Sequence, residues 1–487
     1  MRILFVSSEV YPLIKTGGLA DVSASLPRAL QSLGHQVNVL IPGYRDALGA
    51  AAALGLKPVA SSEIDGHAVR LLETYLPNSR NKAWLLDCPP LYDRPGNPYH
   101  DAAGHPYADN AERFMLLCRA AAQLACGEFG IDWQPEVVHC NDWQSALVPL
   151  LLHERQPRPA LVFTIHNLAY QGMFGEDKFE ALRLPRKYWH PDALEFHGQW
   201  SFIKAGLILA DRITTVSPSY AREIQSAQFG HGLEGLLRHR STVLSGILNG
   251  IDTLAWNPLS DPALAVHYGA TSLAKKRANK IALQAETGLD ADPEQTLLAF
   301  IGRLAEQKGI DLLLEALPTL LPDKVQAILL GSGEPRYQAA LERLADEYPG
   351  QVALHIGYDE ALAHRIEAAA DIFLMPSRFE PCGLNQMYSM RYGTIPVVRA
   401  VGGLADTVTD ANAATLADGS ATGFVMDGDD AAALTTATRR ALALRDDPHA
   451  WQQLQIAGMS RDFSWRHSAR DYERLYQEII AERAADA

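Results

Sequence analysis

The sequence predicts an α/β protein built from two doubly wound domains of similar size. Short apolar runs alternate with amphipathic stretches, which is typical of parallel sheets whose strands are joined by helices. This alternation occurs as two sets, one before and one after a turn-rich segment at 243–258. Each set also contains a Gly-Gly turn that continues Leu-Ala-Asp, "KTGGLADV" at 15–22 and "GGLADTV" at 402–408.

Buried strands are predicted in the first set from apolar runs of five to eight residues. Helices are expected over 19–33 and 109–127, and the segment 243–258 is interpreted as the linker region. The predicted strands are 2–8, 36–42, 83–89, 136–142, 160–167 and 212–218.

The second set repeats the pattern, with a helix expected over 309–321. In open sheets of this kind, ligands bind beyond the carboxyl ends of the strands. The predicted strands are 296–304, 325–334, 352–358, 371–377 and 394–400.

Composition narrows the class of protein. The 487 residues are 47% hydrophobic and 21% charged, which suits a globular protein of two or three domains. A net charge of −14 argues against nucleic acid or an anionic membrane as a partner. Five scattered cysteines without CxxC spacing indicate a reducing compartment and no zinc site. The first residues become polar at Ser7, and no apolar run approaches the roughly 20 residues of a membrane span, so we expect a cytoplasmic protein.

Polar side chains follow several predicted strands, where a purely structural strand would not require them. Taken singly, each has an ordinary explanation: a cap, a satisfied turn or a solvated face. Together they would line one rim of the sheets. These residues are Asn141, Asp142, Trp143, His166, Asn167, Arg303, Lys308, Ser377, Arg378 and Glu380.

The side chains of this set suit one kind of ligand, a sugar joined to a diphosphate. Arg303 and Lys308, with Lys15 beside a glycine turn at a helix start, could meet the negative charge of a diphosphate. Glycine allows a positive φ and a close approach of backbone to ligand, although the turn could equally be a plain strand-to-helix connection. Carboxylates such as Asp142 and Glu380 suit sugar hydroxyls. No clustered His, Asp and Glu pattern suggests a metal site, so the cations would replace a metal.

Six motifs resemble the bacterial glycogen synthases and plant starch synthases, in order and over nearly the whole chain. The resemblance implies the GT-B arrangement, two Rossmann-like domains that face a deep inter-domain cleft. It implies an N-terminal acceptor-side domain at 1–250, a nucleotide-sugar domain at 251–460 and a returning helical segment at 461–487. The motifs are "KTGGLADV", "LYDRPGNPYH" (91–100), "TIHNLAYQG" (164–172), "LNGID" (248–252), "GRLAEQKG" (302–309) and "SRFEPCGLNQ" (377–386).

The activity implied by the resemblance is transfer of glucose from ADP-glucose to the non-reducing 4-hydroxyl of an α-1,4-glucan. Members of this family retain the anomeric configuration, release ADP and use neither a metal nor another cofactor. ADP-glucose and α-1,4-glucan are therefore the expected partners. The sequence leaves oligomeric state, strict ADP-glucose against UDP-glucose preference and accessory glucan sites open.

Site residues follow from the matched motifs. Lys15, Arg303 and Lys308 resemble the groups that meet the donor diphosphate. Asp142 resembles an aspartate that positions groups at the reaction centre, and His166 and Glu380 resemble residues that hold the transferred glucose. These six are the expected catalytic residues. Tyr99 and Asn249 resemble residues near the acceptor and the cleft. Further substrate contacts, these two included, are expected from Gly17, Gly18, Asp21, Tyr99, Asn167, Asn249, Tyr358, Cys382, Gly383 and Leu384.

Three positions depart from related patterns. Tyr388 stands where many GT-B transferases carry a second glutamate, so it receives no ribose role. "HCNDWQ" keeps Asp142 and Trp143 but leaves the roles of Cys140, Asn141 and Gln144 open. The second copy has Val401 in place of a lysine and is interpreted as a turn between strand and helix.

Three other functions are alternatives to glucan synthesis. The Lys-Thr-Gly-Gly turn and "RFEPCGL" count against a sucrose-type or lipid-glycan transferase of the same fold. A glycogen phosphorylase would need a lysine-bound pyridoxal cofactor. A non-catalytic glucan-binding protein would not need the six catalytic candidates together.

Overall fold

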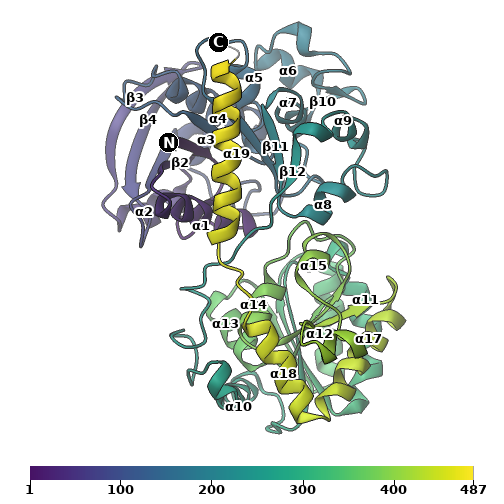
Figure 1. The fold of residues 1–487 in the computed structure, drawn as a ribbon. Coiled ribbons are helices and arrows are strands. Elements are labelled where there is room, and N and C mark those ends of the chain that lie inside the picture. The colour runs from purple at the N-terminus through teal and green to yellow at the C-terminus, as the bar shows by residue number, and fades with distance from the viewer. Residues whose placement is uncertain (486–487) are drawn as a thin grey trace. The chain divides into compact units, whose positions relative to one another are not determined.

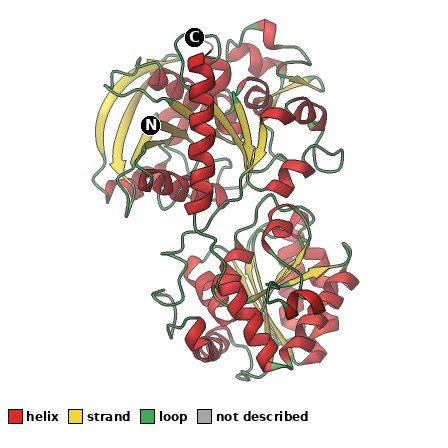
Figure 2. Ribbon diagram, viewed as in Figure 1, coloured by secondary structure: helices red, strands yellow, loops and turns green. Residues whose placement is uncertain are grey.

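The computed structural model describes residues 1–485 and divides into two compact units. The first unit comprises Met1–Gly250 together with the segment from Trp465 onward, and the second comprises Ile251–Ser464. The chain thus leaves the first unit after Gly250 and returns to it at Trp465, close to the predicted boundaries at 250 and 460. In each unit the strands run between layers of helices, as Figure 2 shows.

The first unit is built on a nine-stranded sheet in the order β12-β11-β7-β6-β1-β2-β5-β4-β3. All predicted strands of this half are confirmed, because each is buried on both faces and therefore reads as an apolar run. Their bounds are β1 Arg2–Val6, β2 Gln36–Pro42, β5 Lys82–Asp87, β6 Val137–Asn141, β7 Ala160–Ile165 and β11 Arg212–Thr215, with β12 Leu244–Gly246 inside the predicted linker.

The hairpin of β3 (Lys57–Ile64) and β4 (His67–Tyr75) was missed. It pairs antiparallel with itself and with β5 at the edge of the sheet, and β3 is largely exposed, so it has no continuous apolar run. The sequence of the turn nevertheless indicates a hairpin. Asp65 and Gly66 both have positive φ, 53° and 78°, and an Asp-Gly pair between strands favours a tight hairpin.

Helices complete the first unit, and the two predicted ones are confirmed as α1 (Gly18–Ser32) and α4 (Asn110–Ala125). A small second sheet contains β8 Met173–Phe174, β9 Glu195–Phe196 and β10 Gln199–Ser201. The remaining helices are α2 Arg45–Ala52, α3 Pro89–Tyr92, α5 Val148–Leu152, α6 Glu176–Ala181, α7 Phe202–Leu209, α8 Pro218–Glu223 and α9 Glu234–His239.

The returning helix α19 (Arg466–Ala485) runs along the first unit and packs beside α1 and β7 (Figure 1). Its Tyr476 hydroxyl lies 2.7 Å from Nδ1 of His139 on β6, and the Tyr472 ring packs on the same imidazole. Burial lowers the pKa of His139 to about 3, so the imidazole is neutral at physiological pH. The C-terminal helix is therefore fastened to the centre of the first sheet.

The second unit holds a six-stranded parallel sheet in the order β15-β14-β13-β16-β17-β18. Numbered along the chain from β13, this is the order of a dinucleotide-binding fold. All predicted strands are confirmed, whereas β18 (Phe424–Met426) was missed because three residues give too short a pattern. The others are β13 Thr296–Ile301, β14 Val325–Gly331, β15 Val352–Ile356, β16 Ile372–Met375 and β17 Ile395–Arg399.

Helices cover both faces of this sheet, and the predicted helix 309–321 is α11 (Ile310–Leu320). The others are α10 Lys276–Thr287, α12 Pro335–Glu347, α13 Glu360–Ala369, α14 Asn385–Arg391, α15 Gly402–Thr407, α16 Ala413–Ala417, α17 Ala431–Arg445 and α18 Pro448–Met459. No helix within residues 1–485 is long and apolar enough to cross a membrane.

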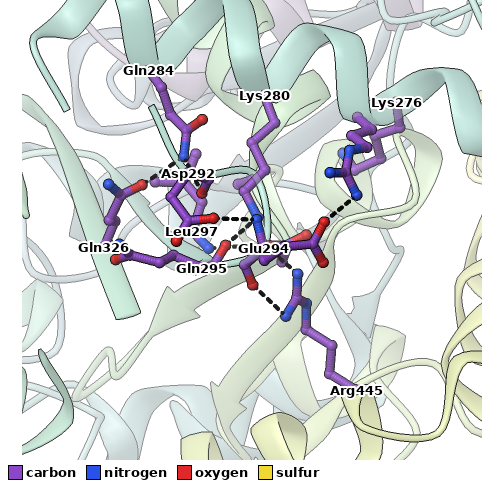
Figure 3. A network of polar contacts seen from close by, with 12 residues as sticks. Lys276, Lys280, Gln284, Asp292, Glu294, Gln295, Leu297, Gln326 and Arg445 are labelled. Carbon is purple, nitrogen blue, oxygen red and sulfur yellow. Dashed lines mark hydrogen bonds and ion pairs between the residues drawn. The ribbon is translucent and has the colours of Figure 1, made fainter. Parts of the chain in front are cut away.

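A polar network fastens α10 to the amino ends of the strands (Figure 3). Lys280 Nζ lies 2.6 Å from the Asp371 carboxylate, which also accepts a 2.8 Å hydrogen bond from the backbone N–H of Leu297. Gln284 donates to the side chain of Gln326 at 2.7 Å. Since these contacts lie at the amino edge, the carboxyl edge remains for ligand chemistry.

Candidate active site

The order of the parallel strands reverses once in each large sheet. In the first unit the reversal lies between β1 and β6, and in the second between β13 and β16. At such a point neighbouring loops diverge and leave a crevice at the carboxyl ends. Lys15 and Asp142 follow the first pair of strands, and Arg303 and Glu380 follow the second.

The Lys-Thr-Gly-Gly loop leads directly into α1. Lys15 Nζ forms an ion pair with Asp21 Oδ1 at 2.9 Å, in the first turn of that helix. Gly17 is extended, with φ of −163°, so it does not use the positive φ that glycine allows. A Cβ built at Gly17 would meet nothing within 4 Å, so the backbone faces open space at this residue. No side chain caps the helix. The start of α1, at Gly18, therefore offers open backbone donors beside a lysine.

Asp142 has a strained backbone, with φ 56° and ψ 179° in a region that is almost restricted to glycine. This conformation aims its carboxylate at the loop after β7, where Oδ1 accepts hydrogen bonds from the backbone N–H groups of His166 (2.7 Å) and Asn167 (3.3 Å). Burial raises the pKa of Asp142 to about 7, against the effect of these two donors and with a further rise from the charge of Glu9. Strain and a shifted pKa together make Asp142 a candidate for a functional carboxylate.

His166 is held by Asn141, the residue whose role the sequence left open. The Asn141 amide nitrogen donates to the Val6 carbonyl at 3.1 Å, so its oxygen is the acceptor for His166 Nε2 at 2.9 Å. Burial lowers the pKa of His166 to about 3, so the ring is neutral and carries its proton on Nε2. Asn167 instead accepts from the N–H of Ala169 at 3.0 Å within its own turn.

Two further candidates of the first unit lie in different surroundings. The Tyr99 hydroxyl lies 2.8 Å from Ser8 Oγ and also contacts Glu9. Asn249 is 6% exposed, and its Oδ1 has no hydrogen-bond partner in the part of the chain that the structure describes. A buried polar atom of this kind requires an explanation, and a ligand hydroxyl would supply one.

In the second unit, Lys308 and Glu380 form the central contact. Lys308 Nζ lies 2.5 Å from Glu380 Oε2, which also accepts a 3.0 Å hydrogen bond from Ser377 Oγ. Glu380 is only 6% exposed, whereas Arg303, beyond β13, is exposed to solvent. The structure thus places a buried carboxylate and a lysine at the reversal of strand order, with an arginine on the same loop as the lysine.

The residues Cys382, Gly383 and Leu384 form the turn into α14. Gly383 has a φ of 69°, which favours glycine, and Leu384 directly precedes the helix. The side-chain amide of Gln386 donates to the carbonyls of Cys382 (3.1 Å) and Gly383 (3.0 Å) and fixes this turn. Cys382 is buried, with 5% exposure.

The second Gly-Gly turn supports the segment that carries Glu380. Gly402 has a φ of 44°, and a Cβ there would overlap the Glu380 carbonyl oxygen. A Cβ at Gly403 would overlap the Cys382 carbonyl, and the Gly403 N–H donates to the Glu380 carbonyl at 3.1 Å. The turn lies between β17 and α15, as the sequence predicts, and glycine is needed because two backbones meet there.

Two tyrosines of the second unit are singled out in the sequence analysis, and their surroundings differ. Tyr358 is 68% exposed and its hydroxyl donates to Glu360 at 2.6 Å, so its expected place in a nucleoside pocket stays a prediction. Tyr388 is buried, and its ring stacks on Trp256 with centroids 3.8 Å apart. Packing therefore accounts for the tyrosine that stands in place of a second glutamate.

Glu9 was missed by the sequence analysis. It follows β1, is 2% exposed, and accepts hydrogen bonds from Thr16 and Tyr99. Its signal was the same as that of Asp142, an acidic residue directly after a buried strand, "FVSSEV". Within residues 1–485, no group of three or more His, Cys, Asp or Glu side chains is arranged to hold a metal ion.

Two Rossmann-like domains with charged residues at their strand reversals define the GT-B class of glycosyltransferases, and the comparisons with known proteins agree. The profile of the family described as "Starch synthase catalytic domain" matches residues 2–239, and "Glycosyl transferases group 1" matches 285–455. The chain belongs to the glycogen and starch synthase family and is an enzyme of that family, a retaining glycosyltransferase.

Individual relatives support this assignment. Glycogen synthase 1 of Methylococcus capsulatus is 54% identical over 484 residues, 99% of this chain and 97% of the relative. Glycogen synthase of Marinobacter nauticus is also 54% identical, over 99% of this chain and 98% of its own. The catalytic domain of starch synthase IV from Arabidopsis thaliana, solved with ADP and acarbose, has a TM-score of 0.89 at 33% identity, covering 98% of this chain and 99% of that domain. Sucrose-phosphate synthase from Thermosynechococcus elongatus, with a TM-score of 0.61 at 20% identity over 99% of both chains, shares the fold.

Gly402→Ala tests the support beneath Glu380. We expect a loss of transferase activity of at least about tenfold and a lower melting temperature, because the new Cβ displaces the Glu380 carbonyl. Gly419→Ala is the matched control, since Gly419 also has a positive φ (73°) but a Cβ there meets nothing within 4 Å. Equal activity losses in the two variants would attribute the effect to backbone strain instead.

Asp142 predicts a pH dependence of both activity and stability. If the ionised carboxylate is the active form, kcat/KM falls below pH 7, and Asp142→Asn removes this limb together with most activity. The folded-state pKa is raised above the unfolded value, so the ionised carboxylate costs stability above pH 7. Asp142→Asn should therefore raise the melting temperature at pH 8 more than at pH 5. A variant that is destabilised equally at both pH values would contradict this.

Proposed function

We propose that the chain transfers glucose from ADP-glucose to the non-reducing 4-hydroxyl of an α-1,4-glucan, with retention of configuration and release of ADP. The contact that carries the proposal is Lys308 with Glu380 at the strand reversal of the second unit. It sets a cation for phosphate beside a buried carboxylate for sugar hydroxyls, which is what a nucleotide sugar requires. The names of the relatives and the ADP in the starch synthase IV structure support this choice of donor.

In the second unit, Lys308 and Arg303 would meet the diphosphate. As the bond between the anomeric carbon and the phosphate oxygen breaks, negative charge collects on the leaving ADP, and fixed cations stabilise it. Glu380 is held in place by Ser377 and Lys308, so its remaining acceptor positions can receive hydrogen bonds from the glucose.

In the first unit, Lys15 adds a cation, while Asp142 and His166 would orient the glucose and the acceptor. Because neither carboxylate is assigned as a nucleophile, we propose attack on the same face that the diphosphate leaves. The acceptor oxygen bonds to the anomeric carbon, the carbon–phosphate oxygen bond breaks, and the acceptor's proton passes to the departing phosphate. The neutral His166 ring accords with a role in hydrogen bonding.

We further propose that the reaction needs no divalent metal and takes place in the cytoplasm. Each unit has its own cations for phosphate, Lys15 in the first and Arg303 with Lys308 in the second, and cationic side chains of this kind can take the place of a metal ion at a diphosphate. The cysteines are free, and four of the five are buried, which suits a reducing compartment.

Glucose incorporation into glycogen tests the proposed function directly. The purified chain is given radiolabelled ADP-glucose or UDP-glucose, with glycogen as the acceptor. We expect incorporation from ADP-glucose to exceed that from UDP-glucose by at least about tenfold and to be unchanged by EDTA. Preference for UDP-glucose would contradict the donor assignment. Activity lost with EDTA and restored by magnesium would contradict the role given to the cations.

Lys308→Ala should reduce kcat by about 100-fold or more, the usual result of removing one group that stabilises charge in the transition state, roughly 3 kcal/mol. The fold should persist, because Glu380 keeps its hydrogen bond to Ser377. Lys187→Ala removes an exposed lysine of the first unit that is paired with Glu154, and serves as the control. Near-normal turnover in Lys308→Ala, checked with the same incorporation assay, would remove this lysine from the mechanism.

A further inference from the structure

Glu9 connects two loops that the proposed reaction uses for different substrates. It follows β1, the central strand beside the reversal in the first sheet, and its side chain is almost fully buried. One carboxylate oxygen accepts the backbone N–H of Thr16, and the other accepts the Thr16 hydroxyl at 2.6 Å. The second oxygen also accepts the Tyr99 hydroxyl. Thr16 is the neighbour of Lys15, so a single buried carboxylate joins the lysine loop to the Tyr99 segment.

The backbone of Glu9 is fixed as firmly as its side chain. The Ser7 hydroxyl donates to the Glu9 carbonyl at 2.9 Å, and Ser23 on α1 donates to Ser7 Oγ at 2.9 Å. Ser8 Oγ lies 2.8 Å from the Tyr99 hydroxyl. The residue that joins the two loops, Glu9, is therefore itself fixed by hydrogen bonds to its backbone.

An ionised carboxylate suits these partners better than its amide. Three donors converge on Glu9, namely the N–H and the hydroxyl of Thr16 and the hydroxyl of Tyr99. A carboxylate has two accepting oxygens, so all three donors are satisfied. Glutamine at this position has one oxygen and turns its NH₂ toward at least one of the donors, and the buried mismatch would loosen a loop.

The charge of Glu9 also reaches Asp142. It raises the pKa of Asp142, in addition to burial, and raises that of Tyr99 in the same way. The groups that face Asp142 are Glu9 from the loop after β1 and the N–H groups of His166 and Asn167 from the loop after β7, with the His166 imidazole neutral. Glu9 is thus the charged group whose negative charge raises the pKa of Asp142.

We propose that Glu9 is a positioning residue that holds the Lys15 loop and the Tyr99 segment in one arrangement around Asp142. Its loss should therefore weaken the use of donor and acceptor together. The inference rests on the proposed function for the identity of these two substrates, but the coupling of the two loops can be measured without any activity.

The central experiment compares Glu9→Gln with the wild type in the ADP-glucose and glycogen assay. We expect kcat to fall by at least about tenfold, with higher KM values for both ADP-glucose and glycogen. The acidic limb, which is the fall of kcat/KM at low pH, should move to lower pH. The reason is that Asp142 loses a neighbouring negative charge, which lowers its pKa. Reduced activity with unchanged KM values and an unmoved limb would show a merely structural residue and overturn the proposal.

Two variants separate contact from charge. Thr16→Val and Tyr99→Phe each remove one donor and keep the Glu9 charge. We expect Thr16→Val to raise mainly the KM for ADP-glucose and Tyr99→Phe mainly that for glycogen, with the acidic limb in place in both. Glu136→Gln is the matched control for charge, since Glu136 is exposed at the amino edge of the same sheet. A limb that moves equally in Glu136→Gln would overturn the assignment to Glu9.

Hydrogen exchange gives a readout that does not depend on the reaction. In Glu9→Gln, deuterium uptake should rise in both 15–22 and 91–100 relative to the wild type and Glu136→Gln. Uptake unchanged in either segment would contradict the coupling, even in an active enzyme. An inactive wild type with increased uptake in both segments of the variant would instead contradict the proposed function and leave the positioning role supported.

Discussion

The ion pair between Lys308 and Glu380 is the interaction on which the proposed chemistry of the second unit depends. The protein has a net charge of −14, so a diphosphate cannot be attracted by its surface as a whole. A cation has to be presented locally, and it has to be kept in place before the ligand arrives. The buried carboxylate of Glu380 holds Lys308 at 2.5 Å, as Asp21 holds Lys15 at 2.9 Å in the first unit. Both lysines are thus preorganised by a carboxylate partner, and preorganised charge is what stabilises a leaving group most.

This ion pair depends in turn on backbone packing. Glu380 lies in a turn whose carbonyl oxygens rest against Gly402 and Gly403, where no side chain has room. Gln386 ties the carbonyls of Cys382 and Gly383 to the start of α14. In the first unit, the carboxylate of Asp142 is held by the backbone N–H groups of the loop after β7. Contacts between neighbouring loops therefore fix the position of each charged group.

Much of the fold could be predicted because parallel strands that are buried on both faces read as apolar runs, as β1 and β13 do. The candidate site followed from polar residues at the ends of these strands. The exposed β3 and the three-residue β18 gave no such pattern. The sequence also could not assign Asn141 or Glu9, because their roles come from partners far along the chain, His166 for one and Tyr99 for the other.

The two Gly-Gly-Leu-Ala-Asp sequences show why a motif alone does not determine a role. Gly17 is extended and faces open space beside a lysine, so the absence of a side chain leaves room for a ligand. Gly402 has a positive φ and lies against the Glu380 carbonyl, so the absence of a side chain there leaves room for the protein's own backbone. The two glycine pairs have the same sequence but different surroundings, open space at Gly17 and a backbone carbonyl at Gly402. Lys15 precedes only the first copy, and only that copy faces space in which a phosphate could be met by a cation.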